Sequence, residues 1–146
     1  MESIWDLHIS ISRRLLLWSG ISIIAGIALI FPGNPFWQGF GIQAVVWGAI
    51  DGMIALVGRQ RASRKKSLTH SPDYLWKEAR KLRRMLWINT GMDVLYIAGG
   101  VVLASVHGNI LWRGHGWGIV LQGGFLFFFD LIHARTIRPA TVPEPT

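Results

Sequence analysis

Residues 85–106, MLWINTGMDVLYIAGGVVLASV, decide the fold class, because they form a long apolar run in which Asp93 is the one charged residue. As a helix, a run of this length rises about 33 Å and crosses the ~30 Å hydrocarbon core of a bilayer. Three more apolar segments carry at most one charge each, at about 15–31, 40–57 and 116–132. The sequence therefore predicts an all-α polytopic membrane protein with four transmembrane helices in a single domain, residues 1–146.

Composition supports this class and excludes several others. The chain is 51% hydrophobic and 16% charged, and its charges gather in the centre and at the two ends. A soluble core would instead interleave charged and apolar residues. The absence of cysteine excludes disulfides, thiolate metal sites and cysteine nucleophiles. Acidic Glu2 and Asp6 precede the first basic pair, and no small-residue cleavage site follows the apolar run, so we expect no removable signal peptide.

Basic residues predict the orientation of the chain. Of the 15 Lys and Arg residues, all except Arg113 fall before the first segment, between the second and third, or after the fourth. Cytoplasmic loops carry such an excess of Lys and Arg, so we expect both termini and the basic loop 58–84 in the cytoplasm. We expect this loop to contact anionic lipid headgroups. Membrane topology already explains its positive charge, so we predict no nucleic-acid partner.

The basic loop divides into two parts. RQRASRKKSLTH, residues 59–70, is predicted to be flexible, whereas Ser71 is predicted to cap a helix that begins at Pro72. Apolar residues at helical spacing among Lys and Arg predict that this helix first lies against the lipid headgroups. The N-terminal segment, with Ser3 and Asp6 at capping-box spacing, predicts a second short interfacial amphipathic helix.

An internal repeat is visible between the two halves of the chain. GNPFWQGFG at residues 33–41 matches GNILWRGHG at residues 108–116 in five of nine positions, and each lies between two apolar segments. We therefore predict two repeated helical hairpins, related by an axis along the membrane normal.

The second, third and fourth apolar segments each contain one carboxylate, namely Asp51, Asp93 and Asp130. Other polar residues share their helix faces, so that the predicted intramembrane polar cluster comprises Asp51, Asp93, Asp130, Gln43, Gln122, Asn89 and Tyr96. Such stripes form either a hydrophilic pocket or a set of hydrogen bonds that fixes helix register. For the pocket, we expect counter-ions from Arg14, Arg84 and His133.

Small residues recur at helical spacing and predict close helix packing. The predicted packing residues are Ala44, Gly48, Gly52, Gly91, Gly99, Gly116 and Gly124. Histidines pair loosely by depth, His107 with His115 and His8 with His133, which leaves haem or pigment binding as an alternative. No ligand spacing supports that alternative, so we predict no cofactor and no metal.

Two functions fit these features. One is a non-catalytic accessory or assembly subunit whose glycine and aromatic faces pack against other membrane helices. The other is a small transporter of protons, cations or cationic solutes that uses the carboxylates, in a homodimer because four short helices enclose little volume. The sequence favours the accessory role, because polar residues are sparse in the outer half of the spans. A membrane enzyme has only the three acids in its favour, without a nucleophile, metal set or phosphate site.

Overall fold

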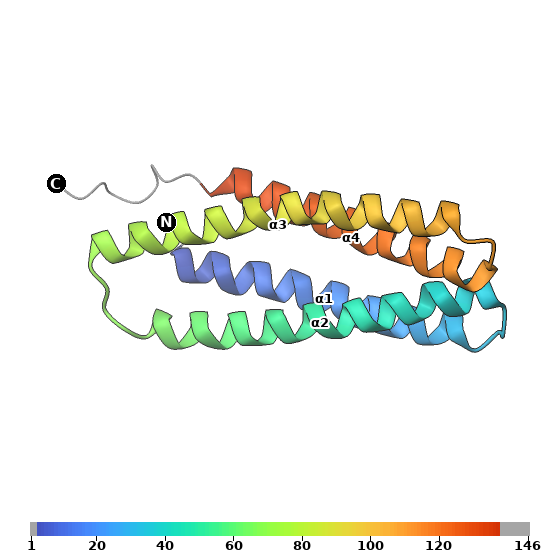
Figure 1. Ribbon diagram of the computed structural model, residues 1–146. Helices are drawn as coiled ribbons and strands as arrows, with labels where there is room; N and C mark the ends of the chain where they lie inside the picture. The colour runs from blue at the N-terminus through green and yellow to red at the C-terminus, as the bar shows by residue number, and fades with distance from the viewer. Residues whose placement is uncertain (1–2, 138–146) are drawn as a thin grey trace.

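The computed structural model describes residues 3–137, and these form four helices and no strands. The helices are α1 (Ile4–Ile30), α2 (Pro35–Lys66), α3 (Pro72–Val106) and α4 (Ile110–Thr136). They run up and down alongside one another in an elongated bundle (Figure 1). All four are long and apolar enough to cross a membrane, so the predicted fold class is confirmed and the chain is a multi-pass integral membrane protein.

Each helix begins at a polar side chain that accepts a hydrogen bond from the first turn. Ser3 accepts from the Asp6 amide at 3.1 Å, and Ser71 accepts from the Tyr74 amide at 3.3 Å, as the sequence predicted. The sequence analysis did not identify the other two caps, which are Asn34 and Asn109. These asparagines occupy the same position in the two GN motifs, and both accept from the amide two residues later. Such caps satisfy donors that the helix itself leaves unpaired.

The predicted flexible segment and the predicted short interfacial helices are corrected by the structure. Helix α2 continues through the basic residues to Lys66, so the connection to α3 shrinks to residues 67–71. In the described chain, the amphipathic segments are the first turns of α1 and α3 rather than separate helices. No glycine or proline interrupts residues 59–71, and basic residues in the last turn of α2 complement the helix dipole. Helix α2 therefore continues through these basic residues beyond its apolar part.

Ion pairs tie these extensions together. Lys65 Nζ lies 3.3 Å from Glu78 Oε1, which joins α2 to α3. Lys66 pairs with Asp6, which joins α2 to the first turn of α1. We call this end of the bundle, with residues 67–71, the basic end.

The Lys66 pair gives a pH-dependent prediction. The hydrogen bond from Lys66, followed by that from Ser3, holds the pKa of Asp6 below its ordinary value of 3.8. Because the folded-state pKa is the lower one, the pair stabilises the fold above pH 3.8 and is lost as the pH falls through the lowered pKa. Lys66→Gln should raise the Asp6 pKa toward 3.8 in a carboxyl-carbon NMR titration. Lys65→Gln is the matched control and should leave that pKa unchanged; an unchanged value in Lys66→Gln would contradict the pairing.

Within each hairpin, glycines bring the helix backbones together. A Cβ on Gly26 would lie 2.6 Å from the Gly41 carbonyl oxygen, which places α1 against α2. A Cβ on Gly100 would lie 2.7 Å from the Gly116 carbonyl oxygen, which places α3 against α4. Real Cβ atoms do not approach a backbone so closely, so both crossings require glycine.

The two hairpins contact each other mainly through α2 and α4. A Cβ on Gly39 would meet the Leu111 carbonyl oxygen, and a Cβ on Gly114 would meet the Phe36 carbonyl oxygen. Gly39 and Gly114 occupy the same position in the two GN motifs, so the contact is reciprocal. We call this end of the bundle the glycine end. An apolar cluster from α1, α3 and α4 closes the basic end instead, with Ile11, Ala79, Leu82, Leu86, Ala134 and Ile137.

Candidate functional site: three buried carboxylates

Three carboxylates from three helices lie inside the bundle, between its two ends. Asp51 of α2, Asp93 of α3 and Asp130 of α4 are 4%, 3% and 7% exposed. They are electrostatic neighbours: the charge of Asp93 acts on both Asp51 and Asp130. All three side chains therefore face the protein interior rather than lipid, as their high cost in lipid requires.

Two of these carboxylates each have one oxygen without a partner. Oδ2 of Asp51 and Oδ2 of Asp93 are buried and accept no hydrogen bond. Asp130 differs, because the Asn89 side chain lies near it. Within residues 3–137, no Lys, Arg or His forms an ion pair with any of the three. A buried carboxylate oxygen without a donor or a cation is unusual, because its desolvation is uncompensated.

The expected counter-ions lie elsewhere. Arg14 contacts His133 with 3.3 Å between Nη1 and Nε2, and His133 Nδ1 lies 2.6 Å from the Phe129 carbonyl oxygen. Arg84 lies on a different surface, with Arg80 and Arg83. The expectation that Arg14, Arg84 and His133 neutralise the carboxylates is therefore not met in this structure.

The two glutamines are satisfied by helices that the sequence analysis did not pair with them. Gln122, which is 2% exposed, accepts from Trp18 Nε1 at 2.9 Å and donates to Ser22 Oγ at 3.3 Å, joining α4 to α1. Gln43 Nε2 lies 3.0 Å from His115 Nδ1, joining α2 to α4. The predicted polar cluster is thus divided. Gln43 and Gln122 make contacts toward the glycine end, and the three carboxylates form a separate group.

Tyr96 does not join the carboxylates. Its ring packs edge-on against Trp47 with 5.1 Å between centroids, and it remains 36% exposed. The sequence reasoning also missed buried hydroxyls on α1, where Ser12, Ser19 and Ser22 are 4–6% exposed. Their signal was available, since these three serines lie on one helical face.

The small residues predicted for packing separate into two groups. Ala44 is buried, Gly48 and Gly52 face Ser19 of α1, and Gly116 faces α3. These four therefore pack within the chain and are not open to a partner. A Cβ on Gly91, Gly99 or Gly124 would meet nothing within 4 Å.

The described histidines lie at both ends of the bundle. His107 and His115 both lie beside Trp112, with ring centroids 5.6 Å and 5.3 Å away, whereas His8 lies near the opposite end of the bundle. Among the residues that the structure describes, no three His, Cys, Asp or Glu side chains lie close enough to hold a metal ion. The three aspartates therefore do not form a chelating site in this arrangement.

A four-helix, multi-pass membrane protein with a buried carboxylate group is the class that this fold and site define. Residues 14–131 match the model of a family of unknown function, DUF6992, and the chain belongs to that family. The matched range includes Asp51, Asp93 and Asp130. Neither a curated protein nor a solved structure matches this chain.

Proposed function

We propose that this protein is a small membrane transporter that takes up protons on its buried carboxylates, with both termini and the basic end on the cytoplasmic side. The observation that carries the proposal is the pair of unpartnered buried oxygens, Oδ2 of Asp51 and Oδ2 of Asp93. The sequence alone favours an accessory role. The proposal differs because these oxygens have no structural partner, while most of the residues expected to pack against a partner pack within the chain.

The energetics of the carboxylates support proton uptake. An aspartate at the centre of a membrane helix costs about 2.5–3.5 kcal/mol, and three neighbouring negative charges repel one another as well. Binding a proton removes the charge and gives the carboxyl a donor. A metal cation would need a group of converging ligands, which the described residues do not form, whereas a proton needs only one carboxylate oxygen. Structural hydrogen bonding explains these residues less well, because Oδ2 of Asp51 and Oδ2 of Asp93 accept no hydrogen bond that would fix helix register.

Polar groups on both sides of the carboxylates also support the proposal. Toward the glycine end lie the Gln122–Ser22 and Gln43–His115 contacts. Toward the basic end lie buried Ser12 and His133. The sequence analysis found few polar groups in the outer half of the spans. It could not show that Gln43 contacts His115 inside the bundle. Such side chains, with intervening waters, are the groups from which proton relays in membrane proteins are built.

Proton flux into liposomes tests the function directly. The purified protein, reconstituted with a pH-sensitive dye inside the vesicles, should carry protons down an imposed pH gradient faster than protein-free vesicles. Infrared titration of the same sample should show carboxylic-acid C=O absorption from the buried aspartates at neutral pH. Asp73→Asn, which removes an exposed carboxylate paired with Lys77, is the matched control and should change neither readout. Flux equal to that of empty vesicles across all gradients would reject transport.

An accessory role is the second candidate, and one observation favours it. Gly91 and Gly99 lie two turns apart on α3 and leave a face that nothing in the described chain covers. If a partner helix packs there, Gly91→Leu and Gly99→Leu should each release it from the complex in native mass spectrometry after gentle extraction. Gly20→Leu is the control, since Gly20 is also open but lies on α1. Extraction of the protein alone from its own membrane would count against this role.

A further inference from the structure

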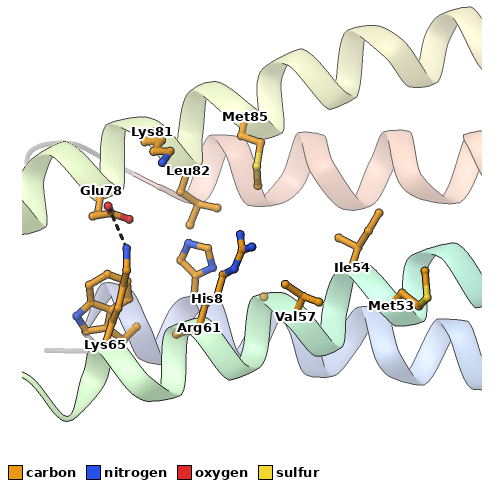
Figure 2. Close-up of a pocket in the computed structure, with 13 residues that line it drawn as sticks. His8, Met53, Ile54, Val57, Arg61, Lys65, Glu78, Lys81, Leu82 and Met85 are labelled. Atoms are coloured by element: carbon orange, nitrogen blue, oxygen red, sulfur yellow. Dashed lines mark hydrogen bonds and ion pairs between the residues drawn. The ribbon is translucent and has the colours of Figure 1, made fainter.

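A crevice of about 540 Å³ lies at the basic end between α2 and α3 (Figure 2). Its floor continues to α1, which contributes Trp5 and His8. The Lys65–Glu78 ion pair bridges the two walls at the end nearest residues 67–71. The crevice is therefore bounded by protein on three sides and at one end.

The wall formed by α2 changes from apolar to basic along its length. Met53, Val57, Arg61 and Lys65 recur every four residues, so they lie on one face of the helix and span about 18 Å. The first two lie toward the middle of the bundle, and the last two lie toward the basic end (Figure 2).

The opposite wall changes in the same direction. On α3, Leu82 and Met85 face the apolar part of the crevice, while Lys81 and Glu78 lie nearer the basic end. Both walls become basic at the same end because α2 ends, and α3 begins, at the connection formed by residues 67–71. The two basic segments therefore lie at the same depth. The crevice thus offers an apolar slot with a cationic mouth.

Polar groups at this mouth lack partners within the protein. In the chain from residue 3 to residue 137, Arg61 and Lys81 form no ion pair. Both line the crevice, and the Arg61 side chain extends between α2 and α3 (Figure 2). Trp5 also lines the crevice, and although it is only 5% exposed, its indole N–H donates no hydrogen bond. Arg61 and Lys81 therefore leave positive charge at the mouth that no acidic side chain of the described residues neutralises.

From this arrangement we infer that the crevice binds one anionic phospholipid of the surrounding bilayer, with its phosphate between Arg61 and Lys81 and an acyl chain along Val57 and Met85. The bilayer is the source, because Met53, Ile54 and Met85 are 67%, 59% and 48% exposed on the lipid-facing side of the slot. A lipid can therefore enter sideways. The basic groups favour an anionic headgroup over a zwitterionic one.

Binding of phosphatidylglycerol and phosphatidylcholine to the full-length protein in detergent, followed by native mass spectrometry, tests this site. The wild type should bind phosphatidylglycerol more tightly. Arg61→Gln with Lys81→Gln should raise its Kd roughly thirtyfold, since each basic residue near a membrane surface contributes about a factor of five. The matched control is Arg59→Gln with Arg83→Gln, which removes the same charge from the same helices outside the crevice. That pair should change the Kd less than threefold.

A second variant keeps the test independent of charge. Val57 is 46% exposed, so Val57→Phe should fold normally while filling the slot, and it should also weaken phosphatidylglycerol binding. Equal loss of affinity in the test and control double variants, unchanged affinity in Val57→Phe, or no headgroup preference in the wild type would each overturn the site. The inference does not rest on proton transport, and Asp93→Asn should bind the lipid normally.

Discussion

Asp93→Asn is expected to abolish proton flux in reconstituted vesicles while leaving the protein as stable as the wild type or more stable. Asparagine has nearly the shape of aspartate but cannot exchange a proton, so the carrier group is lost. Stability should not fall, because Oδ2 of Asp93 has no hydrogen bond to lose and asparagine, unlike ionised aspartate, never carries a buried charge. Vesicle flux and thermal unfolding in detergent, measured on one preparation, check both parts.

Two further variants define this result. Asp51→Asn should behave in the same way, because Asp51 Oδ2 is also unpartnered, whereas Asp73→Asn should keep wild-type flux. If the carboxylates served only to fix helix register, Asp93→Asn would instead lower the unfolding temperature and leave flux unchanged. Wild-type flux in a folded Asp93→Asn protein would remove Asp93 from the mechanism.

Gly114→Ala is expected to produce the largest loss of stability from a single added methyl group. Its Cβ would collide with the Phe36 backbone, including the Cα at 3.1 Å, and a backbone in a helix cannot move aside as a flexible side chain can. Overpacking of this kind costs about 2–3 kcal/mol. The measurement is the free energy of unfolding in mixed detergent micelles.

The matched control for this substitution lies on the same helix. Gly124→Ala adds the same methyl group where nothing lies within 4 Å, so its unfolding free energy should stay within about 0.5 kcal/mol of the wild type. Gly39→Ala, at the equivalent position of the first GN motif, should match Gly114→Ala because it meets the Leu111 carbonyl oxygen. Equal stability of the Gly114 and Gly124 variants would contradict the close α2–α4 crossing.

Local signals predicted the helices and two of their caps. The apolar run at residues 85–106 required a spanning helix, and Ser71 before Pro72 predicted where that helix begins. The prediction of a flexible segment is wrong for residues 59–66, which continue α2, while residues 67–70 lie in the connection as predicted. Nothing in residues 59–66 breaks a helix. Arg, Lys, Gln and Ala favour helix, and pairing with Asp6 and Glu78 fixes the extension in place.

The sequence by itself determined which residues form spanning helices and that each carboxylate had to avoid lipid, because hydrophobic length and the cost of charge in a bilayer depend on each segment alone. It could not determine which polar groups meet. Gln43 contacts His115 and Gln122 contacts Trp18, while Asp51 and Asp93 receive no partner, because helix rotation and the glycine crossings at Gly39 and Gly114 set those distances. Only the tertiary structure, through packing between segments far apart in the chain, decided this.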